Sequence, residues 1–374
     1  MAARRAGLLL WLLGAAAGNA REPAPRCGVQ NFPHDPQKTT RIAIALFGLL
    51  RSNSTMANFE TFMLAPLLAH RPEPYTVDVF LHLNVVAKIT NARTNERAQA
   101  LPAPLAWTRL APCRYALEDQ NVLDVKLGRL RHSLSRERKR DLYKDHGASL
   151  QNLFRALHSL KETARLIEAR ELALDLRYDV VASVRVDTIF TRSVPGDVYA
   201  YVKKSPVAKL FVPHFGCSIQ HDLLLNDRFA VGAREAMLHV YLPRIDTVAN
   251  FTSADDRGKS GLSGERHLFN AVKARGVPTA RMHEFCLRRV RAGGQIWVKV
   301  FTPRDDRTCP LEALDVCDDG CMERQPACAA GRGCHQRGVH IAARLFDGEG
   351  WCDPHASTGH ACRFDYEKLG FGLS

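Results

Sequence analysis

The stretch from Arg177 to Phe190 constrains this chain most, because an apolar strand there carries two internal charges. Arg185 and Asp187 are two positions apart and are therefore predicted to share one face of the strand. Burying a single charge is costly, so the pair needs a partner, a metal or a ligand. Open α/β sheets bind ligands at the carboxyl ends of their strands, which favours a site here; an internal Arg–Asp ion pair is the alternative. The apolar residues, typical of a sheet covered on both faces, are Val180, Val181, Val184, Val186, Ile189 and Phe190.

Strand-like and helix-like segments alternate through residues 41–301, which predicts an α/β sheet covered by helices. The longest predicted helix, Ser149–Leu172, repeats apolar residues at three- and four-residue spacing. Ser263 is predicted to cap the last helix and Gly276 to end it. The other predicted strands are 41–47, 77–83, 114–118, 209–215 and 295–301, and the other predicted helices are 55–70, 233–241 and 263–275.

The charge and the N-terminus restrict the classes of partner. The chain has a formal net charge of +13, which favours anionic partners. Residues 1–20 have a basic start, a short apolar core and small residues at their end, as a secretory signal peptide does. The apolar run is shorter than the roughly 20 residues of a spanning helix, although a short uncleaved anchor remains an alternative. In the secretory lumen or outside the cell, the sequons at Asn53 and Asn250 predict glycans, and nucleic acid is not expected as a partner.

The cysteines are distributed unevenly. Of the eleven in the chain, seven lie between Cys309 and Cys362. In an oxidising compartment this density predicts a disulfide framework for a tail too short to bury a core of its own. The spacings match no common zinc pattern. Because seven is odd, at least one of these cysteines must bond outside the tail, stay free or bridge two chains.

Three ordered motifs carry a resemblance to a known family. They are Phe47-Gly-Leu-Leu-Arg-Ser52, the segment from Tyr178 to Asp187, and the segment from Asn226 to Gly232. Together they resemble GT-A-type glycosyltransferases, and more closely a poorly characterised eukaryotic and algal glycosyltransferase-like family. The resemblance implies a Rossmann-related, mixed, mainly parallel sheet flanked by helices. The expected organisation is a signal peptide (1–20), an N-terminal lead (21–40), a GT-A-like α/β domain (41–305) and a Cys-rich appendage (306–374).

The resemblance also implies a donor site. GT-A enzymes hold a divalent metal, such as manganese or magnesium, with an Asp-x-Asp motif that faces the sugar-nucleotide diphosphate. This chain has Arg185-Val-Asp187 at that place, so Asp187 is predicted to ligate the metal and Arg185 to contact phosphate. Gly48 and Arg51 are predicted to lie near the nucleotide. Their alternative interpretation is an ordinary loop glycine and a surface arginine.

The acceptor side is predicted to hold two carboxylates. Asp227 matches the position that lines the acceptor side of such folds, and its alternative is a turn residue before a helix. Glu265 resembles the carboxylate that deprotonates the acceptor hydroxyl in inverting enzymes. Its alternative is an acidic residue at a helix N-terminus, where the macrodipole favours negative charge.

Two functions remain after these predictions. The first is a lumenal or secreted glycosyltransferase that moves a sugar from a nucleotide-sugar donor to a hydroxyl of a glycan or glycoprotein acceptor. The second is a catalytically silent carbohydrate-binding or interaction protein on the same scaffold, with which Arg185 in place of an acidic residue is compatible. A Rossmann-type methyltransferase is disfavoured, because no G-x-G-x-x-G follows the first strand.

Overall fold

The computed structural model describes most of the chain between residues 27 and 297, together with two short pieces near the C-terminus. The signal peptide predicted at 1–20, Asn53, the side chain of Asn250 and nearly all of the tail predicted at 306–374 lie outside the described residues. The described residues are 27–30, 39–52, 54–70, 72, 74–91, 96–99, 111–134, 145–206, 209–213, 224–250, 262–282, 285–292, 296–297, 335–336 and 339–340.

A mixed eight-stranded sheet forms the centre of the fold, in the order β1-β3-β2-β7-β10-β9-β11, with β6 also pairing with β3. Strands β6, β3, β2 and β7 are mutually parallel, whereas β10 runs antiparallel to both of its neighbours. The mostly parallel core confirms the predicted sheet. Its strands are β1 (Val29–Gln30), β2 (Thr40–Gly48), β3 (Tyr75–Val85), β6 (Arg114–Asp119), β7 (Val180–Arg185), β9 (Leu210–Pro213), β10 (Phe229–Ala233) and β11 (Thr279–Met282).

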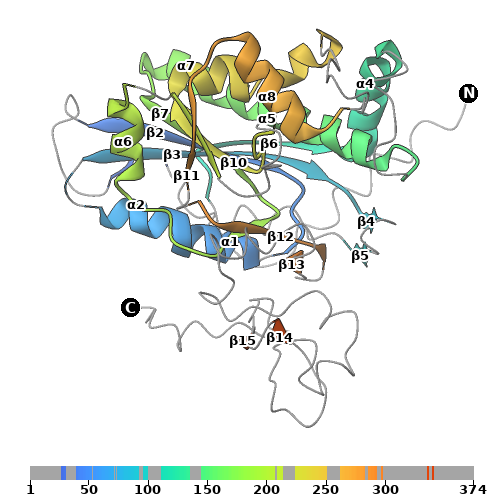
Figure 1. The fold of residues 1–374 in the computed structure, drawn as a ribbon, viewed down its shortest axis with the longest axis horizontal. Helices are drawn as coiled ribbons and strands as arrows, with labels where there is room; N and C mark the ends of the chain where they lie inside the picture. The colour runs from blue at the N-terminus through green and yellow to red at the C-terminus, as the bar shows by residue number, and fades with distance from the viewer. Residues whose placement is uncertain are drawn as a thin grey trace, which may run out of the picture.

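Helices cover both faces of this sheet (Figure 1). Helices α4, α5 and α8 lie on one face, and α1, α2 and α6 pack against the other. The helices are α1 (Ser54–Phe59), the π-helix η1 (Glu60–Leu64), α2 (Ala65–Ala69), α4 (Gln120–Ser133), α5 (Ala148–Leu174), α6 (Val198–Lys204), α7 (Arg234–Ala236), the π-helix η3 (Met237–Tyr241), the 3-10 helix η4 (Arg244–Asn250) and α8 (Gly264–Ala274).

The alternation of side chains along β2 explains why it lies between two cores. Ile42, Ile44 and Leu46 point into the core beneath α1 and α2, while Ala43 and Ala45 face the core beneath α5. All five are almost fully buried, as expected for a strand covered on both sides. Small residues on the α5 side let that long helix lie close to the sheet and bring its N-terminal turns over the ends of the strands.

The predicted continuous strand from Val180 to Phe190 is wrong in one respect. It divides into β7 in the main sheet and β8 in a second sheet, with a turn at Val186 and Asp187 between them. The Thr188 hydroxyl donates to the Arg185 carbonyl across this turn at 2.6 Å. Arg185 and Asp187 therefore do not share a strand face. The second sheet contains β8 (Thr188–Phe190), β12 (Leu287–Val290) and β13 (Ile296–Trp297), and two hairpin pairs are β4 (Lys88–Asn91) with β5 (Glu96–Gln99) and β14 (His335–Gln336) with β15 (Val339–His340).

Most other predicted elements form near their predicted positions, and Ser263 caps α8 by accepting from the Arg266 backbone N–H. The segment 229–233, predicted only as a lead-in to a helix, is strand β10. The N-terminal lead joins the sheet, because β1 pairs with β3 and a disulfide links Cys27 to Cys113. We find no helix among the described residues with the length and apolarity needed to span a bilayer.

Candidate functional site

A cavity of about 160 Å³ opens at the carboxyl ends of β2, β3 and β7. The chain passes from β2 to β3 on one side and returns to β7 on the other, so this is the point where the strand order reverses. Ligands of open α/β sheets bind at such points. All six residues predicted from the sequence to form a site line this one cavity, and these are Gly48, Arg51, Arg185, Asp187, Asp227 and Glu265.

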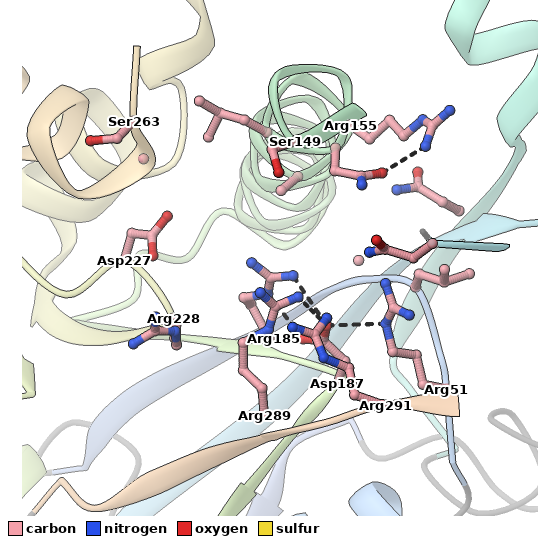
Figure 2. A pocket seen from close by; sticks show the side chains of 18 of the residues that line it. Arg51, Ser149, Arg155, Arg185, Asp187, Asp227, Arg228, Ser263, Arg289 and Arg291 are labelled. Carbon is pink, nitrogen blue, oxygen red and sulfur yellow. Dashed lines mark hydrogen bonds and ion pairs between the residues drawn. The ribbon is translucent and has the colours of Figure 1, made fainter. Parts of the chain in front are cut away.

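Three arginines surround the Asp187 carboxylate (Figure 2). Arg185 binds it through two nitrogens, Nε to Oδ1 at 3.0 Å and Nη2 to Oδ2 at 3.1 Å. Arg289 donates Nη2 to Oδ2 at 3.1 Å, and Nε of Arg51 lies 3.3 Å from the same oxygen. The side chain of Asp187 is only 3% exposed. The ion pair proposed as the alternative interpretation therefore exists, and it forms one wall of the cavity.

These contacts bear on the predicted metal. Burial by itself raises the pKa of Asp187, but Arg185, Arg289 and Arg51 outweigh it and hold that pKa well below its usual range. Both carboxylate oxygens already accept hydrogen bonds from guanidinium groups. A divalent cation on this carboxylate would lie against several positive charges, so the residues present do not fit a metal at Asp187. They fit an anion placed on the exposed side of the arginines.

A second carboxylate, Glu96, extends the cluster away from the cavity. It pairs with Arg51 and lies 3.6 Å from Nη1 of Arg291, and it accepts from the Ala292 backbone N–H at 2.9 Å. Four guanidinium groups (51, 185, 289 and 291) thus share two carboxylates (96 and 187), which leaves a formal charge of +2. Burial lowers the pKa of Arg289, and the neighbouring Arg185 lowers it further. Within the described part of this wall the arginines outnumber the carboxylates that they contact, and such a cluster is suited to binding a phosphate or diphosphate.

The opposite wall of the cavity carries Asp227 and Glu265 (Asp227 in Figure 2). Asp227 precedes β10, and its carboxylate lies against Gly264 at the start of α8, where a methyl group would overlap it. Burial raises the pKa of Glu265, and the nearby charge of Asp227 raises it further, while Arg228 at 3.7 Å acts in the opposite direction. A carboxylate with a raised pKa in a cleft is suited to accepting a proton at neutral pH.

Gly48 ends β2 with a φ of +116°, a backbone conformation that side-chain-bearing residues rarely adopt. Its N–H donates to the Ser159 hydroxyl of α5 at 3.0 Å, which ties the end of the strand to the helix above it. The loop that follows turns back and brings Arg51 to Asp187. Gly48 therefore lines the cavity at the end of β2, and its closeness to a nucleotide stays a prediction.

Several residues of the cavity were not predicted, above all Arg289 and Arg291. They come from β12 and the residue after it, in the sequence Leu287-Arg-Arg-Val-Arg291. The signal was present, because three arginines there lie in a buried segment and need partners for the same reason as Arg185. Arg228 and Arg155 line other parts of the wall.

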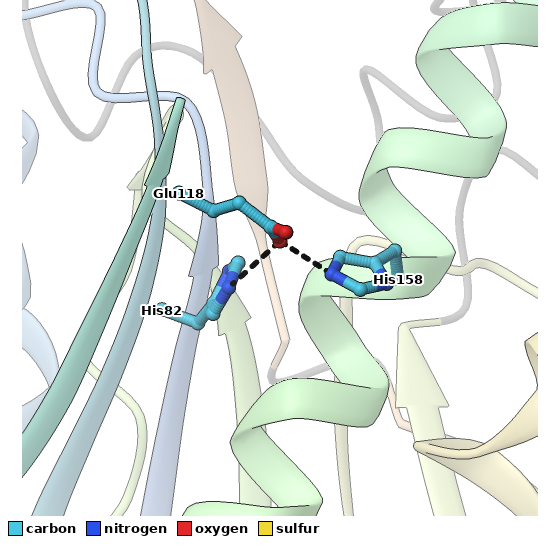
Figure 3. A group of neighbouring side chains, drawn as sticks. All are labelled: His82, Glu118 and His158. Carbon is cyan, nitrogen blue, oxygen red and sulfur yellow. Dashed lines mark hydrogen bonds and ion pairs between the residues drawn. The ribbon is translucent and has the colours of Figure 1, made fainter. Parts of the chain in front are cut away.

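Within the described residues, a group of side chains that could hold a metal ion lies outside the cavity lining. It consists of His82, Glu118 and His158 (Figure 3). The predicted metal at Asp187 and this group are at different places.

Neither a protein-family model nor a curated protein matches this chain. Among solved structures, the apo form of mouse xyloside xylosyltransferase 1 is similar to it, with 9% identity and a TM-score of 0.32, over 65% of this chain and 85% of that one. A likeness at this TM-score says nothing about donor, acceptor or activity. These have to be inferred from the cavity.

Proposed function

We propose that this protein transfers a sugar from a nucleotide-sugar donor to a hydroxyl group of a glycan or glycoprotein acceptor. The observation that carries the proposal is the polarity of the cavity. Its one wall has a net positive guanidinium cluster, and its other wall has a pair of carboxylates in which the pKa of Glu265 is raised. Glycosyl transfer needs both, because negative charge develops on a departing diphosphate while a proton leaves the acceptor.

In the proposed reaction the arginines perform the part that a metal performs in many such enzymes. Arg185 and Arg289 bind the diphosphate, and Asp187 holds their guanidinium planes in place. The acceptor oxygen attacks the anomeric carbon, and the bond from that carbon to the diphosphate oxygen breaks. Glu265 takes the proton of the acceptor hydroxyl, and the nucleoside diphosphate leaves with the bonding electrons. Attack from the side opposite the diphosphate inverts the anomeric configuration.

The test measures binding and turnover separately, on the full-length chain with EDTA present. Calorimetry with nucleoside diphosphates is expected to show saturable binding without metal. Arg289→Gln is expected to weaken it about 10- to 100-fold, because a charge-assisted hydrogen bond contributes about 1.5–3 kcal/mol. Arg165→Gln is the matched control, since that arginine makes an exposed pair with Glu162 far from the cavity.

Turnover is measured as donor hydrolysis and transfer across a panel of nucleotide sugars. Glu265→Gln is expected to keep nucleoside-diphosphate affinity and to lose transfer by at least about 100-fold, the typical contribution of a general base. Failure of every nucleoside diphosphate to bind would reject the proposal. Glycan binding with no donor turnover, unchanged in Arg289→Gln, would instead assign the silent carbohydrate-binding function.

A further inference from the structure

His82, Glu118 and His158 converge from three different elements (Figure 3). His82 lies on β3, Glu118 on the neighbouring β6 and His158 on α5, which crosses above both strands. Oε2 of Glu118 lies 3.7 Å from Nε2 of His82 and 2.5 Å from Nε2 of His158. One nitrogen or oxygen atom of each residue lies within 4.8 Å of the other two. The side chain of His82 is 2% exposed, whereas those of Glu118 and His158 are 14% and 17% exposed.

Ser159 links the backbone and the ring of His82. The Ser159 hydroxyl oxygen lies 3.1 Å from the His82 carbonyl oxygen and 2.8 Å from His82 Nδ1, and it accepts from the Gly48 N–H at 3.0 Å. When its one proton is donated to the carbonyl, the hydroxyl oxygen accepts from Nδ1. In that arrangement the neutral imidazole, the form that burial favours, carries its proton on Nδ1 and its lone pair on Nε2.

This tautomer leaves two acceptors facing each other. The lone pair of His82 Nε2 then faces the carboxylate oxygen Oε2 of Glu118. Neither atom carries a hydrogen in this tautomer, so the two cannot form a hydrogen bond with each other. Nε2 of His82 and Oε2 of Glu118 are 3.7 Å apart. Two ligand atoms bound to one tetrahedral ion at about 2.0 Å each are about 3.3 Å apart, which is close to this distance. A cation between them would satisfy both atoms. His158 Nε2 provides a third donor, once the ion replaces the hydrogen shared with Glu118 and the ring keeps its proton on Nδ1.

The surroundings also fit a metal site. Lys126 binds Oε1 of Glu118, which leaves Oε2 as the single oxygen directed at both histidines. Metal-bound histidines normally donate their other N–H to a fixed acceptor, and Ser159 provides that acceptor for His82. The site offers two imidazoles and one carboxylate and leaves a fourth position open. This ligand set favours the binding of zinc over that of magnesium or calcium.

We infer that His82, Glu118 and His158 form a binding site for a zinc-class divalent transition-metal ion. The site is separate from the sugar-transfer reaction proposed above and does not depend on it. Its ligands join β3, β6 and α5, whose neighbouring residues Asn84, Gln120 and Arg155 line the cavity. A bound ion would therefore stabilise one wall of the cavity without touching a ligand inside it.

The experiment uses the full-length chain, freed of metal by chelation and then titrated with Co²⁺. The wild type is expected to bind one equivalent that gives visible d–d bands typical of nitrogen and oxygen ligands, without the near-ultraviolet charge-transfer band of thiolate ligands. The absence of the thiolate band distinguishes cobalt bound at this site from cobalt bound by the cysteines of the tail. Zn²⁺ is expected to displace the cobalt and to raise the melting temperature of the chain.

Two variants remove ligands that are partly exposed and so spare the fold, Glu118→Gln and His158→Gln. Each is expected to lose the cobalt bands and the zinc-dependent rise in melting temperature. The matched control is His239→Gln, which removes an exposed histidine of η3 that lies 2.8 Å from Glu235 and belongs to no part of the candidate metal site. It should bind cobalt as the wild type does.

Ser159→Ala tests the tautomer argument itself, because it removes the acceptor for Nδ1 and leaves all three ligands. It is expected to weaken cobalt affinity about 10- to 100-fold. The inference is overturned if the wild type shows no such bands. It is also overturned if Glu118→Gln and His158→Gln, with an unchanged circular dichroism spectrum, bind cobalt with the same spectrum and affinity as the wild type.

Discussion

Replacing Asp187 by asparagine removes the negative charge at the centre of the arginine cluster and keeps the size of the side chain. The formal charge of the four arginines and their carboxylates then rises from +2 to +3. Breaking a buried ion pair from one side costs about 3–5 kcal/mol. Because Arg185 and Arg289 are 20% and 23% exposed to the cavity, where water and ions reach them, we expect the lower value, about 3 kcal/mol.

A loss of this size is measurable by thermal unfolding. One kcal/mol shifts the melting temperature of a domain of this size by about 2–4 °C, so Asp187→Asn is expected to melt roughly 6–12 °C below the wild type in phosphate-free buffer. Pyrophosphate should raise the melting temperature of the variant more than that of the wild type, because the anion replaces the missing charge. Asp246→Asn is the control, since that carboxylate is 54% exposed and pairs only with Lys161 among the described residues.

The pH dependence gives a second check on the same variant. The pKa of Asp187 is lower in the folded state than in the unfolded state, where it is near 4. The ionised carboxylate therefore contributes its full stabilisation of the fold above about pH 4, and this contribution is lost progressively as the pH falls below that value. The difference in stability between wild type and Asp187→Asn should therefore narrow in acid. Equal melting temperatures at neutral pH, or a deficit that pyrophosphate leaves unchanged, would refute the view that Asp187 organises an anion-binding cluster.

Two further predictions concern α8. Gly264→Ala adds a methyl group that overlaps the Asp227 carboxylate, so we expect the variant to lose transfer activity. Its affinity for nucleoside diphosphates in calorimetry should be retained, because the arginines on the opposite wall are unchanged. Unchanged transfer activity would contradict the packing of Asp227 against this glycine. Burial lowers the pKa of His267 to about 4, against the opposing effect of its 2.8 Å bond to the Arg244 carbonyl. The folded state then binds fewer protons than the unfolded state, and stability falls by about 3 kcal/mol as the pH drops from about 6.5 to 4. In denaturant titrations across this range, His267→Gln should show a shallower decline than the wild type, and an equal slope would count against the assignment.

Much of the fold could be predicted because the signals are local. The apolar run that ends at Gly48 in β2 and the three- and four-residue spacing of apolar residues in α5 are contained within their own segments. Each could therefore be assigned to an element without knowledge of the rest of the chain. The break after Arg185 was not predicted, since apolar residues continue through it to Phe190. That turn depends on the Thr188 hydroxyl and on β12, which pairs with β8 from about one hundred residues later in the sequence.

The sequence by itself determined where charge must be compensated: Arg185 and Asp187 interrupt an apolar segment, and burying either charge alone is costly. It also placed Gly48, Asp227 and Glu265 at the ends of elements, where a parallel sheet collects its ligands. Tertiary structure alone decided how the charge at position 187 is balanced, because Arg289 and Arg51 approach it from distant parts of the chain. For the same reason only the folded chain could join His82, Glu118 and His158, since the distance between side chains depends on strand order and helix packing rather than on sequence spacing.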